Sequence, residues 1–218
     1  MSGTGILIAC LALTIAGSAP PLPALQPLQK NAVVLAFGDS LTYGTGAPPA
    51  QSYPSILEKI IARKVINAGI PGEDTRHALA RLPRLLERYH PSLLILCHGA
   101  NDLLQNFSEL QAAENIRGMI RMAVGRGIQV VLIGVPYPGH LVSQPSFYAS
   151  IAKELAIPFT RDALAKILVE PPLRSDSIHP NARGYRLLAE AIADFLQKCG
   201  AISKQTPDQR QGEPLTPT

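Results

Sequence analysis

A serine, a histidine and an aspartate in this sequence have the types and spacing needed for acyl transfer. Ser40 follows Gly38 and Asp39 directly after an apolar run, and a serine on such a sharp strand-to-helix turn exposes its hydroxyl as a nucleophile. That hydroxyl needs a base, for which His179 is the candidate, and Asp176 lies three residues earlier, within reach of the same imidazole. We therefore expect a nucleophile (Ser40), a base (His179) and a carboxylate that orients the base (Asp176).

Acyl transfer also needs hydrogen-bond donors for the negative oxygen of its tetrahedral intermediate. The backbone N–H groups of Ser40 and Gly72 and the side-chain amide of Asn101 can supply three such donors. Glycine at position 72 lets the backbone approach a ligand closely. Simpler roles stay open, since serine and asparagine often stabilise turns and glycine often serves a positive φ. Asp39 and Asp102 are interpreted as structural, and His98 as a buried histidine near the site.

These residues must be positioned by the elements around them, which alternate between strand and helix patterns. Continuous apolar runs, typical of parallel strands covered on both faces, occur at 32–37, 93–97 and 130–135, with weaker strand candidates at 65–70 and 156–160. We predict an α/β fold with a single doubly wound, flavodoxin-like, five-stranded parallel sheet and helices on both faces. Active sites in such sheets lie at the carboxyl ends of the strands, so the polar segments would share one rim.

The helices between these strands are predicted from apolar spacing and capping residues. Ser52 and Ser108 each precede an amphipathic pattern and are candidate N-caps. Residues 75–89 are predicted as two helical pieces, because Pro83 interrupts the pattern and suits the first turn of the second piece. The last helix is expected at about 183–199, ending before Gly200.

Four sequence blocks in order resemble the SGNH/GDSL hydrolase superfamily. They are Gly38-Asp39-Ser40-Leu41, Gly72, Gly99-x-Asn101-Asp102 and Asp176-x-x-His179-Pro180. Residues 67–86 are especially similar to the thioesterase I/lysophospholipase/arylesterase branch, and the resemblance covers about residues 33–197. It implies Ser40 as nucleophile, His179 as base, Asp176 as its partner, and Ser40, Gly72 and Asn101 as the oxyanion hole.

The loops after the third and fourth predicted strands are expected to line an apolar acyl pocket. Their candidate substrate-binding residues are Leu103, Leu104, Phe107 and Tyr137, together with Leu141 and Val142. We expect a serine hydrolase that cleaves carboxylic esters or thioesters, including aryl esters, short-to-medium acyl esters, acyl thioesters and lysophospholipids. The alternatives are a carbohydrate O-acetyl esterase and a non-catalytic binding module on the same fold. No cofactor and no metal are expected.

Other enzyme classes on related folds lack their motifs here. There is no Walker sequence GxxxxGK[ST], no Asp-x-Asp pair after the first strand, and no GxGxxG for a dinucleotide. The α/β-hydrolase motif GxSxG fails because Leu41 and Thr42 follow Ser40.

Composition limits the partners and divides the chain into three parts. The net charge of +4 is mild, aromatic residues are 5% and tryptophan is absent, which argues against nucleic-acid binding. Residues 1–29 carry no charge and contain an apolar run at 6–16, so we expect a signal peptide or N-terminal anchor with a Pro-rich linker. A hydrolase domain at 30–202 and a disordered tail at 203–218 follow. We expect a periplasmic or secreted monomer whose N-terminus allows weak membrane association.

Overall fold

The computed structural model describes residues 22–139 and 143–203 of the 218-residue chain. The apolar run expected to be a leader, Leu141 and Val142, and all of the expected tail except Ser203 lie outside the described residues. The predictions made for these segments stay predictions.

Five parallel strands form the sheet, in the order β2-β1-β3-β4-β5. The strands are β1 (Val33–Gly38), β2 (Lys64–Gly69), β3 (Leu93–Cys97), β4 (Gln129–Ile133) and β5 (Phe159–Thr160). In the register, Gly38 at the end of β1 lies opposite both Gly69 of β2 and Cys97 of β3. The three strands therefore end level with one another, and the loops that follow them meet at one rim.

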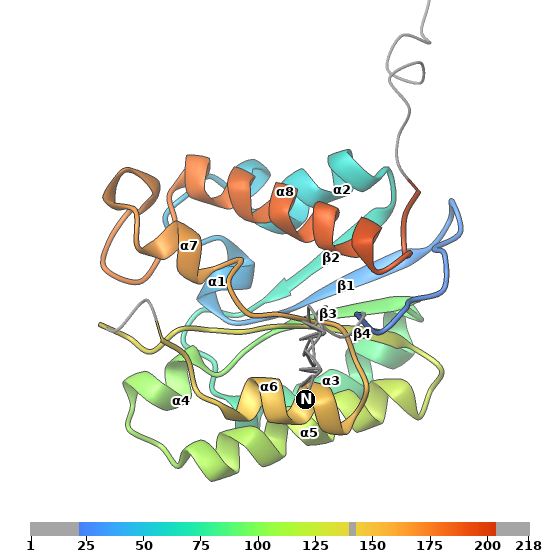
Figure 1. The fold of residues 1–218 in the computed structure, drawn as a ribbon, viewed down its shortest axis with the longest axis horizontal. Helices are drawn as coiled ribbons and strands as arrows, with labels where there is room; N and C mark the ends of the chain where they lie inside the picture. Colours follow the sequence, from blue (N-terminus) through green and yellow to red (C-terminus); the bar gives the residue numbers. More distant parts are fainter. Residues whose placement is uncertain (1–21, 140–142, 204–218) are drawn as a thin grey trace, which may run out of the picture.

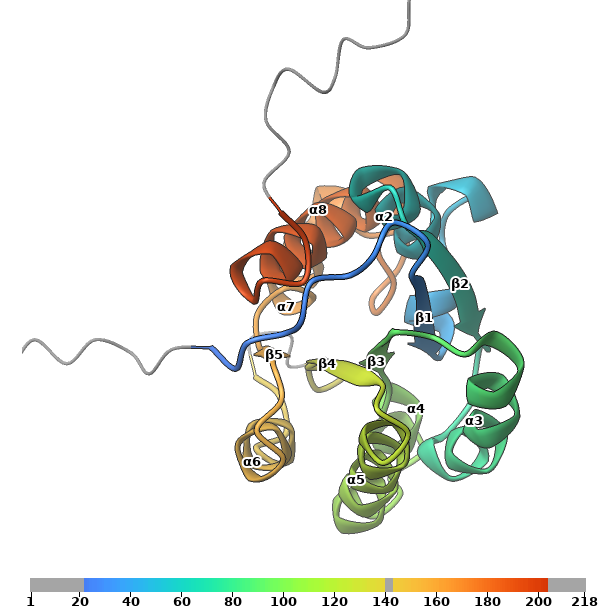
Figure 2. The ribbon, with the colours of Figure 1, turned by 90° about the vertical axis from the view of Figure 1, so that its right-hand side faces the viewer.

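Helices cover both faces of this sheet, as the continuous apolar strands require (Figures 1 and 2). One face carries α2 (Tyr53–Ile61) and α8 (Ala182–Lys198), and the other carries α3 (Thr75–Tyr89), α5 (Glu109–Val124) and α6 (Phe147–Glu154). Short helices lie in the connections: α1 (Ser40–Tyr43), α4 (Ala100–Leu104) and α7 (Ala165–Leu168), with 3₁₀ turns at Pro49–Gln51 and Pro171–Leu173. The predicted doubly wound α/β fold is thus confirmed. No helix within the described ranges is long and apolar enough to cross a bilayer.

The structure corrects three local predictions. Helix α3 is one helix, although Pro83 lies inside it and cannot donate to the carbonyl four residues earlier; its inward face buries Ala78, Leu82 and Leu86, and that packing outweighs the lost hydrogen bond. Ser52 occupies the N-cap position of α2, but its hydroxyl donates to the Pro49 carbonyl instead of capping the helix. Strand β5 is shorter than expected: it is preceded by Ala156, which has a left-handed φ of 50°, and by Pro158, which has no N–H to donate.

The folded unit also begins earlier than the boundary expected at residue 30. The Leu25 and Leu28 N–H groups donate to the carbonyls of Cys199 and Ala201 at 2.7 and 2.8 Å. These two leucines are only 8% and 6% exposed. This segment runs along the end of α8 before it enters β1 (Figure 2). Residues that the sequence assigns to a Pro-rich linker therefore cover part of the core.

This packing predicts that Leu28→Ala lowers the free energy of unfolding by about 2 kcal/mol, the low end for a buried leucine because the site is at the edge of the core. Leu22 is the matched control, because it is 44% exposed in the same segment, and Leu22→Ala should stay within about 0.5 kcal/mol of the wild type. Urea unfolding measures both. Equal stabilities for the two variants would show that the segment does not contribute to the fold.

Candidate active site

The turn after β1 places Ser40 at the start of a helix on the rim of the sheet. Asp39 is the N-cap of α1, and its side chain accepts from the Leu41 N–H at 3.0 Å. A side chain at Gly38 would collide with the Cys97 carbonyl and the Thr42 hydroxyl, so glycine allows the tight exit from the strand. Ser40 is the first residue of α1, and it lines a cavity.

The loop before α8 brings a histidine and an aspartate to this serine. His179 Nε2 lies 2.9 Å from Ser40 Oγ, and His179 Nδ1 lies 2.8 Å from Asp176 Oδ2. The other carboxylate oxygen of Asp176 accepts from the backbone N–H groups of Ile178 and His179 at 2.9 and 2.8 Å. When Nδ1 donates to Asp176, Nε2 is left as the acceptor for the Ser40 hydroxyl. This is the arrangement in which a serine can transfer its proton to a histidine.

The charge on Asp176 is favoured by its surroundings. Partial burial acts to raise the pKa of this carboxyl, but hydrogen bonds from the Ile178 N–H and from the ring and backbone of His179 hold the pKa below its usual value. Asp176 is therefore ionised at neutral pH. It can orient the imidazole and stabilise the imidazolium that forms when His179 takes a proton.

The structure brings the expected oxyanion-hole residues to the same cavity. Gly72 has a φ of +78°, a left-handed conformation that favours glycine, in the loop after β2. Asn101 lies in α4, directly beyond β3, and its Nδ2 donates to the Glu73 carbonyl at 3.0 Å. An amide nitrogen carries two hydrogens, so a second N–H remains for a ligand. Ser40, Gly72, Asn101 and His179 all line one cavity of about 200 Å³.

Most of the cavity wall is apolar. Its other lining residues are Leu41, Thr45, Pro71, Ala100, Leu104, Val135, Pro136, Pro138, Leu168 and Ile178. Ile178 lies inside the His179 block, where its position next to the histidine could have revealed it. Leu168 comes from α7, outside the four sequence blocks, and no sequence pattern marks it.

Of the four expected substrate-binding residues, only Leu104 lines this cavity. Phe107 lies in a separate hollow beside Asp74 and Asp102. The Tyr137 hydroxyl donates to the Glu109 carboxylate at 2.8 Å, and Leu103 is half-buried outside the lining. The side-chain directions within α4 and the two loops, which the sequence pattern does not specify, account for this difference from the expected lining.

Asp39 and Asp102 have structural partners, as their interpretation required. Asp39 caps α1, and its burial raises the pKa of its carboxyl. Asp102 accepts from the Thr75 N–H at 3.0 Å and from the Thr75 hydroxyl at 2.7 Å, and Asn115 Nδ2 donates to the same hydroxyl at 2.9 Å. This buried network fixes α4, which carries Asn101, to α3 and α5.

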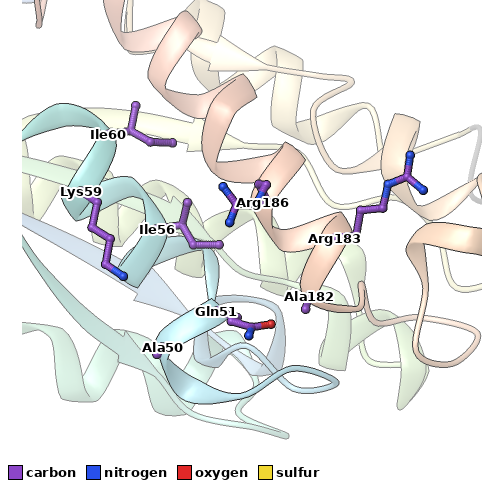
Figure 3. A pocket seen from close by; sticks show the side chains of 8 residues that line it. All are labelled: Ala50, Gln51, Ile56, Lys59, Ile60, Ala182, Arg183 and Arg186. Atoms are coloured by element: carbon purple, nitrogen blue, oxygen red, sulfur yellow. The ribbon is translucent and has the colours of Figure 1, made fainter. Parts of the chain in front are cut away.

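A larger hollow of about 680 Å³ lies between α2 and α8 (Figure 3). It is lined by Ala50, Gln51, Ile56, Lys59, Ile60, Ala182, Arg183 and Arg186. None of these side chains belongs to the Ser40 constellation, so the size of a hollow does not identify the site. In the part of the chain that the structure describes, no cluster of three or more His, Cys, Asp or Glu could hold a metal ion.

Comparison with known proteins agrees with this geometry. The model of the GDSL-like lipase/acylhydrolase family matches residues 36–187. The chain belongs to this family. It is 29% identical to an arylesterase of Vibrio mimicus over 181 residues, which are 78% of this chain and 90% of that protein. It is 27% identical to the thioesterase 1/protease 1/lysophospholipase L1 of Escherichia coli K12 over 172 residues, covering 75% of this chain and 83% of that protein.

A solved esterase structure also resembles this chain. The crystal structure of AlinE4, an SGNH-hydrolase family esterase, matches with a TM-score of 0.62 and 31% identity, covering 78% of this chain and 97% of that one. The match extends over nearly the whole of that esterase. Together with the family model and the curated relatives, it places this GDSL-family chain among esterases.

The geometry predicts how the activity of this GDSL-family chain depends on pH. Nε2 of His179 must be unprotonated to accept the Ser40 proton, whereas the lowered pKa of Asp176 keeps that carboxyl ionised well into the acid range. We expect kcat/KM for p-nitrophenyl butyrate to fall as the pH drops from 8 to 5, because a protonated Nε2 cannot accept the Ser40 proton. The measurement is a pH–rate profile between pH 5 and 8.

His77 provides a matched control for this profile. Its Nδ1 lies 2.8 Å from the Asp74 carboxylate, three residues earlier, which reproduces the His179 pair without a serine. His77→Gln should leave the profile unchanged. A flat wild-type profile, or an acid limb that disappears in His77→Gln, would remove His179 as the base.

Proposed function

We propose that this GDSL-family esterase hydrolyses carboxylic esters and thioesters through an acyl-enzyme on Ser40. The observation that carries the proposal is the 2.9 Å contact between Ser40 Oγ and His179 Nε2, on the wall of a cavity that Gly72 and Asn101 also line. The oriented base activates the serine, and the neighbouring donors receive the charge that develops on the substrate oxygen.

Each step can be assigned to atoms of this chain. Ser40 Oγ attacks the carbonyl carbon while its proton passes to His179 Nε2, and the carbonyl oxygen becomes an oxyanion beside the Ser40 and Gly72 N–H groups and the Asn101 amide. The C–O or C–S bond of the substrate then breaks, and Nε2 returns the proton to the departing alcohol or thiol. Water repeats the sequence on the acyl-enzyme, releasing the carboxylic acid and free Ser40.

The cavity favours an acyl chain of short to medium length. Leu104, Leu168 and Ile178 belong to its mostly apolar wall, which suits a hydrocarbon better than a sugar. Its volume of about 200 Å³ is small for a long fatty acyl chain. The arylesterase and thioesterase names of the relatives support aryl esters and acyl thioesters as substrate classes. The second candidate, a carbohydrate O-acetyl esterase, would use the same catalytic residues.

A chain-length series separates these two candidates. Each methylene buried in an apolar pocket contributes about 0.8 kcal/mol, or about fourfold in kcat/KM. We expect kcat/KM for p-nitrophenyl esters and acyl-CoA thioesters to rise from acetate, to peak between butyrate and octanoate, and to fall at palmitate. A maximum at acetate would favour the O-acetyl esterase instead.

Variants of two adjacent leucines test where the acyl chain of the substrate lies. Leu104 lines the cavity and Leu103 does not, so Leu104→Ala should weaken the preference for octanoate over acetate by up to about tenfold, while Leu103→Ala keeps the wild-type ratio. Equal ratios in the two variants would place the acyl chain elsewhere.

The role of Asn101 predicts a selective loss of kcat. A donor aimed at the oxyanion binds the transition state more tightly than the ground state, so Asn101→Ala should lower kcat by about 10²–10³ with little change in KM. Asn101→Asp should be at least as harmful, because an ionised carboxylate repels the oxyanion and cannot donate. Kinetics and melting temperatures of both variants provide the measurement. A stable, nearly fully active Asn101→Asp enzyme would exclude Asn101 from the oxyanion hole.

A further inference from the structure

We propose that Glu73 and Arg81 are positioning residues of the oxyanion hole, which hold the Gly72 N–H and the Asn101 amide in place through a partly buried ion pair. The inference rests on the proposed esterase function. Neither residue lines the cavity, and neither belongs to the four sequence blocks. Both act through the backbone of the loop that follows β2.

The ion pair between these residues is nearly enclosed and has two hydrogen bonds. Arg81 Nε donates to Glu73 Oε1 at 2.8 Å, and Arg81 Nη2 donates to Oε2 at 2.6 Å. The Glu73 side chain is only 6% exposed and that of Arg81 22%. A bidentate pair of this kind fixes orientation as well as distance. The pair therefore restrains Glu73 much more strongly than an exposed salt bridge would.

The Arg81 guanidinium is itself anchored to the sheet. Its Nη2 also donates to the Ala68 carbonyl near the end of β2 at 3.0 Å. Its central carbon lies 4.4 Å from the centre of the Phe37 ring, which belongs to β1 and is fully buried. The loop residue Glu73 is thus tied to the two strands that position Ser40 and Gly72.

A third group reaches the same carboxylate from β3. His98 is fully buried at the end of that strand, and its Nε2 lies 3.3 Å from Glu73 Oε2. Its Nδ1 accepts from the Gly99 N–H at 3.2 Å, so Nε2 carries the proton and donates to Glu73. These hydrogen bonds and the Arg81 charge hold the pKa of Glu73 below its usual value, although burial acts to raise it. The histidine that the sequence placed near the pocket therefore belongs to this support.

The backbone of Glu73 contacts the Asn101 amide and closes the turn that contains Gly72, so it connects the side-chain donor of the oxyanion hole with a main-chain donor. Its carbonyl accepts from Asn101 Nδ2 at 3.0 Å and so fixes the plane of that amide. Its own N–H donates to the Ile70 carbonyl at 3.2 Å, which closes the turn that holds Gly72 in its left-handed conformation. When the carboxylate is anchored, the carbonyl on one side and the Gly72 peptide on the other cannot rotate freely.

Glu73→Gln and Arg81→Lys test this role with small changes of shape. The first removes the charge, and the second removes the bidentate fork while keeping the charge. Since small misplacements of catalytic groups cost about 10²-fold, we expect kcat to fall by about 10–10² in both variants, with KM within about threefold of the wild type. The affinity for an alkylboronic acid, whose tetrahedral adduct on Ser40 places an oxygen in the hole, should fall by a similar factor.

Arg117→Lys is the matched control. Arg117 is 17% exposed and pairs with Glu114 and Glu154 on the α5 and α6 side of the molecule, and it is not among the residues that line the cavity. This variant should keep wild-type kcat and boronate affinity, whatever its melting temperature. A loss of activity that merely follows stability would appear in the control as well.

A double variant locates the effect. If Glu73 acts through Asn101 and Gly72, Glu73→Gln should cost clearly less kcat in an Asn101→Ala background than in the wild type. Wild-type kcat in both Glu73→Gln and Arg81→Lys, or full additivity with Asn101→Ala, would overturn the proposal. If Glu73→Gln does not fold, Arg81→Lys and its double variant with Asn101→Ala decide the question. Ser40→Ala separates a failure of this proposal from a failure of the proposed function. If the proposed function is wrong, Ser40→Ala keeps its activity. If only the role of Glu73 and Arg81 is wrong, Ser40→Ala is inactive while Glu73→Gln and Arg81→Lys keep the wild-type kcat.

Discussion

The pairing of Gly38 with Gly69 on one side and with Cys97 on the other is the constraint on which the site depends. It makes three neighbouring parallel strands end at the same level. The turn after each strand then supplies one part of the site: Ser40 after β1, Gly72 after β2 and Asn101 after β3. Gly38 preserves this geometry because any side chain there would collide with the Cys97 carbonyl on the neighbouring strand. A slip in register would separate the Ser40 hydroxyl from Gly72 and Asn101.

The other two members of the proposed catalytic set lie outside the sheet and need their own supports. His179 and Asp176 lie in the loop before α8, where one carboxylate oxygen takes two backbone N–H groups and the other takes the imidazole. Asn101 and Gly72 have supports of a similar kind. Asp102 holds α4 through hydrogen bonds from the buried Thr75, and Glu73 and Arg81 restrain the loop that contains Gly72. These supports are charged or polar groups with several hydrogen bonds each. They keep the donors fixed before the substrate binds, as electrostatic stabilisation of an oxyanion requires.

The sheet, and the gathering of the sequence blocks around one cavity, could be predicted from sequence because both leave local signals. Buried parallel strands read as continuous apolar runs, and the Ser40, Asn101 and His179 blocks have fixed spacing. The rest depends on distant contacts. Helix α3 continues through Pro83 because its inward face is buried against the domain, and Leu28 belongs to the core because it covers the end of α8. Leu168 reaches the cavity from α7, and the partnership of Glu73 with His98 joins two loops 25 residues apart. No periodicity or motif encodes these contacts.

The proposed mechanism requires that the hydroxyl of Ser40 becomes acylated during turnover. Rapid acid quench of the enzyme with p-nitrophenyl butyrate, followed by intact-mass analysis and peptide mapping, tests it most directly. We expect a transient butyryl adduct on the peptide that contains Ser40, formed and lost at rates consistent with turnover and absent from Ser40→Ala. An adduct on another residue, or full hydrolytic activity of Ser40→Ala without any adduct, would contradict the mechanism.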